Sequence, residues 1–157
     1  MSPFDSEFGP HWRDYLFQSL IATVVIFIVL LVLHLQNAVI VASIGATTFI
    51  IFAMPKSVTA HPRRVIGGHI VGLVCGALVS LLSPHEGIVS MALFAGAIGL
   101  SIFLMVITDT EHPPASGTAL GVAISGISIR IFLAVLFSVC VLSLFHGITR
   151  SRLRDLT

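Results

Sequence analysis

Four long stretches of the chain are almost entirely apolar, and two shorter apolar stretches lie between them. A helix needs about 20 apolar residues to cross the hydrocarbon core of a bilayer, and the long stretches approach or reach that length. They cover residues 15–35, 65–82, 88–107 and 127–145. The shorter stretches, 38–54 and 114–125, are rich in Gly, Ala, Ser and Thr, which is typical of tightly packed or broken membrane helices. The pattern predicts an all-α, polytopic transmembrane bundle.

The distribution of Lys and Arg bears on whether the two short stretches also cross. Basic residues near the ends of spans prefer the cytoplasmic side. If both short stretches cross, seven of the 8 basic residues share one side and only Arg130 lies opposite. If both are re-entrant, the same seven residues split four against three. The charges therefore favour six crossings with both termini in the cytoplasm.

Six crossings would divide the chain near Pro84 into two halves. Each half then consists of a long span, a short stretch and another long span, and an odd number of crossings inverts the second half relative to the first. The short stretches share small and hydroxyl-bearing residues at 43–48 and 115–119. A 3+3 inverted repeat is therefore a hypothesis.

Composition agrees with a membrane protein and limits its partners. The chain is 56% hydrophobic and only 10% charged, with a mean hydropathy of +1.07, whereas about 25% of the residues of a soluble domain are charged. Spans and short connections use up the 157 residues, so we expect one transmembrane domain over 1–157, with a polar tail at 1–13 and a basic tail at 148–157. A net charge of +1 provides no basic surface for nucleic acid.

The polar segment 59–69 places paired arginines, paired glycines and a histidine at the start of a predicted span. Pro62 suits the first turn of a helix, and Arg63 and Arg64 would lie at the headgroup level. Anchoring of the span accounts for one of these arginines and leaves a further role open for the other. His69 lies further inside, where a polar ring needs a partner. Ionisable residues within a membrane often mark a functional site, but a neutral histidine also holds two helices together by a hydrogen bond. Both interpretations stay open.

The second polar segment, 108–119, contains a histidine followed by two prolines. Consecutive prolines end one helix and favour the start of the next. Free backbone N–H groups at such a start, with nearby hydroxyls and a glycine that permits close approach, suit a small anion. A capped helix start without a ligand is the alternative. The candidate substrate-binding residues here are His112, Pro113, Pro114, Ser116, Gly117 and Thr118.

The first short stretch offers a similar set of groups. Its hydroxyls can bind substrate or satisfy backbone carbonyls, and its glycine can serve a ligand or close helix packing. Pairing with the second short stretch favours a site framed by both, near the middle of the membrane. The candidate residues here are Ser43, Gly45, Thr47 and Thr48.

A metal site is the main chemical alternative. His61, His69 and His112 are available with Asp109 and Glu111, but no HExxH or paired Glu-x-x-His spacing is present. The sequence also lacks a phosphate-binding loop, a nucleophile elbow and a CxxC pair. We therefore expect no catalytic residues, no metal and no other cofactor.

Segments 61–69 and 111–120 together resemble the HPP family of integral membrane proteins, and the family's namesake triplet would be residues 112–114. The resemblance covers most of the chain. Members are commonly described with four membrane spans, which differs from the six crossings that the charges favour. Plant and cyanobacterial relatives look like nitrite transporters, so the resemblance implies that nitrite is the substrate.

Taken together, the sequence predicts a transporter of a small inorganic anion in the plasma membrane, and the resemblance to the HPP family implies that this anion is nitrite. His112 would carry a coupled proton, because histidine titrates near neutrality. An anion channel with the same pore residues, a metal-dependent membrane enzyme and an assembly protein are the alternatives. A homo-oligomer in the lipid bilayer is also expected, because several glycines offer close-packing faces. These glycines are Gly72, Gly76, Gly96 and Gly99.

Overall fold

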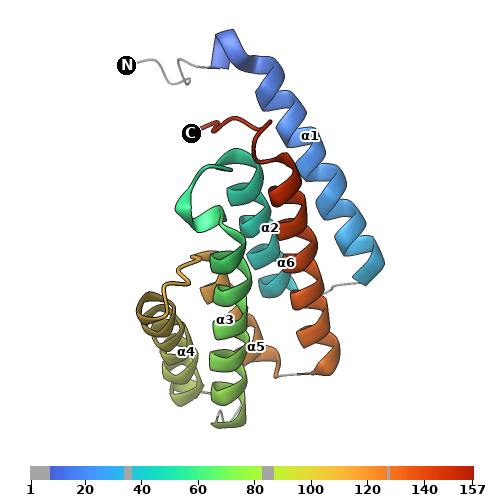
Figure 1. Cartoon of the computed structure of the whole chain (residues 1–157). Coiled ribbons are helices and arrows are strands. Elements are labelled where there is room, and N and C mark those ends of the chain that lie inside the picture. Colours follow the sequence, from blue (N-terminus) through green and yellow to red (C-terminus); the bar gives the residue numbers. More distant parts are fainter. Residues whose placement is uncertain (1–7, 34–36, 83–86, 127) are drawn as a thin grey trace.

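Helices account for nearly all of the chain in the computed structural model (Figure 1). The structure describes residues 8–33, 37–82, 87–126 and 128–157. Within these residues the chain forms six α-helices, one short 3-10 helix and no strand. They are α1 (Phe8–Leu33), α2 (Ala38–Ala53), η1 (Val58–Ala60), α3 (Pro62–Leu82), α4 (Gly87–Ile107), α5 (Pro114–Ser125) and α6 (Ile129–Thr149). The predicted all-α bundle is confirmed.

Four of these helices, α1, α3, α4 and α6, are long and apolar enough to cross a membrane, as the pattern predicts. The largest difference in bounds is at α1, which begins at Phe8 because the polar residues before the apolar run are also helical, with a kink at His11. Residues 34, 35 and 127 of the predicted spans lie outside the described residues. Side-chain caps begin two other helices, Asn37 at α2 and Ser128 at α6.

Most residues of the short helix α5 are buried or half-buried, whereas the short helix α2 has one buried face and one exposed face that includes Phe49. At 1.5 Å per residue, the 12 residues of α5 extend about 18 Å, which is less than the roughly 30 Å of a hydrocarbon core. Successive helices run in opposite directions in Figure 1, so the start of α1, the end of α2 and the end of α6 meet. Six crossings and the inverted repeat stay predictions.

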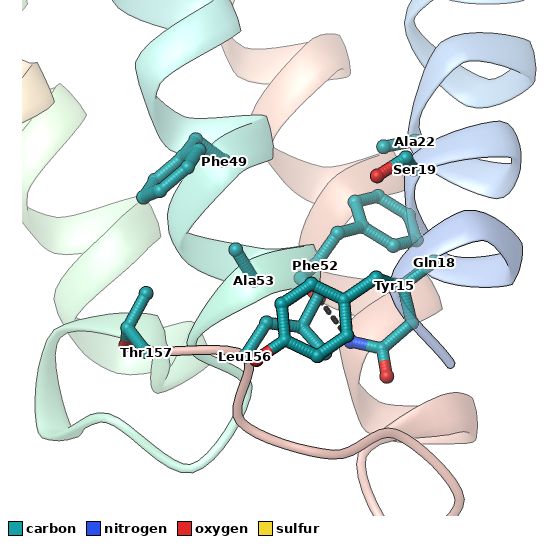
Figure 2. Close-up of a pocket in the computed structure, with 9 residues that line it drawn as sticks. All are labelled: Tyr15, Gln18, Ser19, Ala22, Phe49, Phe52, Ala53, Leu156 and Thr157. Atoms are coloured by element: carbon teal, nitrogen blue, oxygen red, sulfur yellow. Dashed lines mark hydrogen bonds between the residues drawn. The ribbon is translucent and has the colours of Figure 1, made fainter. Parts of the chain in front are cut away.

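The C-terminal segment is tied to that end of the bundle through Gln18 of α1. The side-chain amide of Gln18 donates to the carbonyl oxygens of Phe52 and Arg154, and its oxygen accepts from the Arg154 N–H at 3.0 Å. Figure 2 shows Gln18 beside Phe52, with Leu156 next to them. The Leu156 N–H also donates to the Ala53 carbonyl. These bonds place the last residues against α1 and α2.

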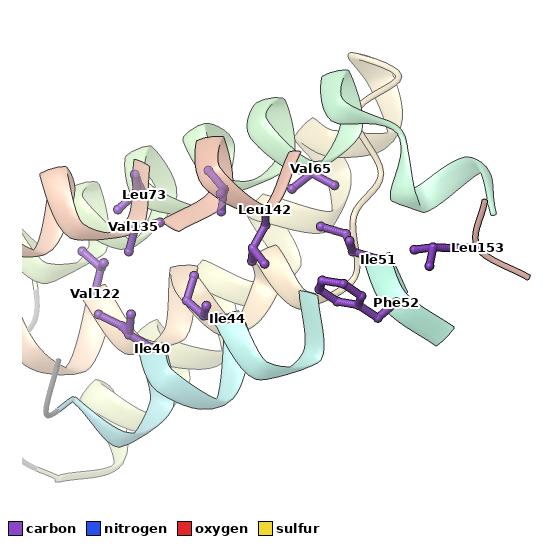
Figure 3. Packing of buried hydrophobic residues seen from close by; sticks show 11 residues of the cluster. Ile40, Ile44, Ile51, Phe52, Val65, Leu73, Val122, Val135, Leu142 and Leu153 are labelled. Carbon is purple, nitrogen blue, oxygen red and sulfur yellow. The ribbon is translucent and has the colours of Figure 1, made fainter. Parts of the chain in front are cut away.

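A buried apolar cluster joins α2, α3, α5 and α6 (Figure 3). Ile44 and Leu142 are fully buried in it. Large apolar side chains on the outside of the bundle are instead exposed, and those of α1 form an almost continuous outer surface, as expected of a helix that faces lipid. They include Leu16, Phe17, Leu20, Val24, Phe27, Ile28 and Leu31.

The closest packing in the bundle is between α3 and α5, where glycines of α3 face the backbone of α5. A Cβ atom at Gly72 would overlap the carbonyl oxygen of Ala115, and one at Gly76 would lie 2.5 Å from the carbonyl oxygen of Ala119. Small residues spaced in this way let two membrane helices approach closely. The expectation that these two glycines form lateral oligomer faces is therefore wrong, because their missing side chains are used within the chain.

Gly96 and Gly99 of α4 behave differently. Both are exposed, and a Cβ at either position would meet nothing within 4 Å. They stay available for contact with another molecule in the membrane.

We predict that Gly72→Ala lowers the thermal unfolding midpoint of the purified protein in detergent. The added methyl group forces α3 away from α5, and overpacking of this kind costs about 1–3 kcal/mol. Gly99→Ala is the matched control and should not lower the midpoint, because space is open at that position. An equal loss of stability in the two variants would contradict the close-packed α3–α5 contact.

Candidate functional site

A cluster of buried polar side chains lies where α2, α3 and the start of α5 meet. Thr47 comes from α2, His69 from α3, Thr118 from α5, and His112 from the segment before α5. All four residues are fully buried. Polar groups are costly in such a place unless they bond to one another.

Thr47 bridges the two histidines. Its Oγ1 lies 2.9 Å from Nε2 of His69 and 3.0 Å from Nε2 of His112. The imidazole rings are tilted, and their centroids are 5.3 Å apart. One hydroxyl thus contacts both rings.

The contacts continue beyond each histidine and end at backbone carbonyls. On one side, Nδ1 of His112 lies 2.9 Å from the carbonyl oxygen of Thr59 in η1. On the other side, Nδ1 of His69 lies 2.8 Å from Oγ1 of Thr118.

From Thr118 the contacts pass to α2. Thr118 Oγ1 lies 2.8 Å from Oγ of Ser43, and the Ser43 hydroxyl lies 2.6 Å from the Pro114 carbonyl oxygen. We call this series of contacts the polar chain; the Thr47 hydroxyl makes one more contact beside it, at 3.1 Å from the Ser43 carbonyl oxygen. It runs in the order Thr59 carbonyl, His112, Thr47, His69, Thr118, Ser43 and Pro114 carbonyl.

Helical spacing explains how the sequence brings these groups together. Ser43 and Thr47 are four residues apart and share one face of α2. His69 follows Gly68, where a Cβ would lie 2.8 Å from Cβ of His112 and 2.9 Å from the Thr110 carbonyl. The bare backbone at Gly68 therefore lets the segment with His112 settle next to His69.

The predicted candidates divide into two groups. Five of them supply side chains to the polar chain and Pro114 supplies its carbonyl, so six of the eleven meet as expected. The others do not join it. Gly45 is exposed on α2, and Thr48 is buried but bonds to the Ile44 carbonyl of its own helix. A Cβ at Gly117 would meet Cβ of Ser43 at 3.3 Å, so this glycine serves packing between α2 and α5.

The remaining two candidates, Pro113 and Ser116, line a cavity of about 390 Å³ next to His112. Apolar side chains of α4 form its other wall, and Glu111 contributes the charged group. His112 therefore faces both the polar chain and this cavity.

The expectation of free N–H groups at the start of α5 is wrong. The Ala115 N–H donates to the His112 carbonyl, and the Ser116 N–H donates to the Pro113 carbonyl. Pro113 and Pro114 have no N–H to offer. The first turn of α5 is closed by its own backbone, so an anion would have to be bound there by side chains.

A second cleft, of about 330 Å³, opens at the end of the bundle where α3 begins. Most of its charged lining is basic, and η1 lies between it and His112. The lining includes Lys56, His61, Arg63, Arg64, Arg150, His146 and a single acid, Asp109.

Arg64 fixes the segment that carries His112. Its guanidinium pairs with the carboxylates of Asp109 and Glu111, and the Arg64 side chain is only 19% exposed. Asp109 has a left-handed backbone (φ 54°), which Asp tolerates better than most residues. Among the described residues, no three His, Cys, Asp or Glu side chains gather as metal ligands would.

Comparison with known sequences identifies the family of the chain. The sequence pattern described as "HPP, transmembrane region" matches residues 8–154, which is nearly the whole chain. The chain belongs to the HPP family. The resemblance carried by segments 61–69 and 111–120 is confirmed.

Relatives of this HPP protein include two transmembrane proteins of Dictyostelium discoideum. One is 36% identical over 98 residues, covering 62% of this chain and 34% of the relative. The other is 32% identical over 99 residues, covering 59% of this chain and 32% of the relative. The chain thus spans about a third of the length of these relatives. No solved structure matches it.

Two parts of the site were missed from the sequence. The Thr59 carbonyl carries no side-chain signal, so only the fold reveals that it bonds to His112. The sequence leaves open which of Arg63 and Arg64 anchors the span and names no partner for either, whereas Arg64 forms the ion pairs described above. The sequence does contain a signal for these ion pairs, because residues 63–64 are basic, Asp109 and Glu111 are acidic, and both segments lie at the ends of predicted spans.

We predict that Arg64→Ala destabilises this HPP protein more than Arg63→Ala does. Charge-assisted hydrogen bonds are worth about 1.5–3 kcal/mol, and Arg64 makes them with two carboxylates. The Arg63 side chain is 64% exposed, and its contacts with the Asp109 carboxylate at 3.5 Å and the Thr108 carbonyl at 3.4 Å are long, so its loss should cost under about 1 kcal/mol. Thermal unfolding in detergent measures the difference, and equal effects would contradict a specific role for Arg64.

Proposed function

We propose that this HPP protein transports a small inorganic anion, with nitrite as the substrate and a proton as the coupled ion. The observation that carries the proposal is the buried polar chain, which places two histidines in contact with one hydroxyl inside the bundle and includes His112, a residue that also lines a cavity. Ionisable groups are expensive in such a setting and are a default sign of function in membrane proteins. A hydrogen bond that only held helices together would need one histidine at most, whereas two lie here with their ring centroids 5.3 Å apart.

The basic cleft supports an anionic substrate. Several cations facing one cleft raise the local concentration of anions. Asp109 lines the cleft, and Glu111 and His112, which follow it closely in the chain, line the cavity. An anion attracted to the cleft would therefore be close to the buried site. The basic residues that line the cleft also favour a cytoplasmic position for this end of the bundle, where α1 begins and α6 ends, and therefore cytoplasmic termini in a plasma membrane.

An anion channel would use the same groups and remains the nearest alternative, which current recordings distinguish from coupled flux. No observation among the described residues favours a metal-dependent enzyme. The exposed Gly96 and Gly99 of α4 are the surface that we propose for a homo-oligomer.

We predict that the purified protein in proteoliposomes takes up nitrite in a saturable manner when the lumen is more alkaline than the outside. His112→Ala should reduce uptake about tenfold or more, because this ring contacts both the cavity and the polar chain, and tenfold corresponds to roughly 1.4 kcal/mol. Nitrate, chloride and formate serve as competitors.

Ser138→Ala is the control for the loss of a buried polar group. Ser138 is fully buried in α6 and bonds only to the Ala134 carbonyl of its own helix, so uptake should stay within about twofold of the wild type. Absence of nitrite uptake by correctly folded wild-type protein under every pH gradient would refute the assignment of nitrite.

A further inference from the structure

The number of hydrogen atoms in the polar chain points to a property beyond anion binding. The chain has six contacts in series, and both of its ends are backbone carbonyls, which only accept hydrogen bonds. Between the two ends lie three hydroxyls and two imidazoles. Each hydroxyl and each neutral imidazole has one hydrogen to donate. Five hydrogens are thus available for six contacts.

From this count we propose that the polar chain is a proton-binding site, in which one extra proton is shared by His69 and His112 through the hydroxyl of Thr47. With one extra proton, each of the six contacts receives one hydrogen. Every group in the series then donates toward one neighbour and accepts from the other, except the cationic ring, which donates in both directions.

Two arrangements of this proton satisfy the six contacts equally. When His112 is the imidazolium, its Nδ1–H donates to the Thr59 carbonyl and its Nε2–H donates to Thr47. The Thr47 hydroxyl then donates to Nε2 of His69. The Nδ1–H of neutral His69 donates to Thr118. The Thr118 hydroxyl donates to Ser43, and the Ser43 hydroxyl donates to the Pro114 carbonyl.

The proton passes to His69 by two coupled transfers. The N–H bond at Nε2 of His112 breaks as a new O–H bond forms on Thr47. The original O–H bond of Thr47 breaks as an N–H bond forms at Nε2 of His69. Thr47 ends with one hydrogen, His112 is neutral with its hydrogen on Nδ1, and His69 is the imidazolium.

A seventh contact is the least favourable in both arrangements. The Thr47 hydroxyl also lies 3.1 Å from the Ser43 carbonyl in its own helix, longer than any of the six. The Thr47 hydrogen is used within the polar chain in both arrangements, so only this longest contact is left without a hydrogen. The proposal therefore requires no change in the positions of the heavy atoms.

One proton is the expected limit. A second imidazolium 5.3 Å from the first would be strongly repelled in a buried setting. The charged groups nearest this region are Arg64, Asp109 and Glu111, which pair with one another, and Arg63 and His61 lie beyond them in the basic cleft. None of them contacts either ring within the described residues.

The proposal deepens the proposed function, since it assigns the coupled proton to two histidines rather than to His112 alone. It also assigns the proton and the anion to two different places. Every hydrogen in the filled polar chain is already used, so it has none to donate to an anion. The anion would lie next to it, beside His112 and Ser116 in the neighbouring cavity, where the carboxylate of Glu111 is neutralised by its ion pair with Arg64.

The first test needs no anion. Protein labelled with ¹⁵N-histidine is placed in nanodiscs of phosphatidylcholine and phosphatidylglycerol, and the spectra are recorded from about pH 8 to about pH 4. The signals of the two rings are assigned from His69→Gln and His112→Gln. We expect one protonation event that shifts the Nε2 signals of both rings together, with His112 carrying its hydrogen on Nδ1 at high pH. Protonation of one ring alone, or of neither, would overturn the proposal.

Substitutions of Thr47 provide the matched comparison. Thr47→Ser keeps the bridging hydroxyl and should preserve the shared event, whereas Thr47→Val has a similar volume but no hydroxyl. In Thr47→Val the two rings should no longer respond together, and the midpoint should fall by about one pH unit, or roughly 1.4 kcal/mol. Ser138→Ala again serves as the control. A shared event that persists in Thr47→Val would refute the role of this hydroxyl.

Flux measurements then separate the two proposals. In proteoliposomes the wild type and Thr47→Ser should move one proton with each nitrite, whereas Thr47→Val should lose about nine-tenths of the coupled proton flux. A shared protonation without any nitrite flux would refute the substrate assignment and leave the proton site intact. Nitrite flux without proton flux in the wild type would refute the proton site's role in coupling.

Discussion

The contact between the backbones of α3 and α5 positions nearly everything else in this HPP protein. Lipid tails are as apolar as the helices, so burial of apolar surface does not drive membrane helices together, and close packing and hydrogen bonds must do so. At Gly72 and Gly76 the two backbones meet with no side chain between them. The same approach brings His69 within 2.8 Å of Thr118. The packing of α3 against α5 therefore also assembles this part of the polar site.

The polar chain in turn holds the short helix α2 in place. Ser43 bonds to the Pro114 carbonyl, and Thr47 contacts both histidines. Such bonds are worth about 0.6–2 kcal/mol each in membrane proteins, so they add to the packing energy without replacing it. What they add most is specificity, because a rotation of α2 would leave several polar groups without partners in an apolar interior.

The sequence predicted the helices well and the site in part. Long apolar runs and the Pro113-Pro114 pair mark helix bounds directly, which is why five of the helices begin within three residues of the predicted positions. The buried hydroxyls and histidines were found because polar residues are rare in such runs. The role of the Thr59 carbonyl and the use of Gly72 and Gly76 within the chain depend on which helices are neighbours, and a single sequence does not contain that information.

The position of His112 explains why a proton and an anion would bind together. A lone imidazolium or a lone anion pays a large desolvation cost inside a membrane protein. His112 is the last side chain at one end of the polar chain and also lines the neighbouring cavity, so under the proposed function a positive charge on the polar chain would lie next to the bound anion. Each ion would then lower the cost of binding the other, and thermodynamic linkage would make the effect equal in both directions.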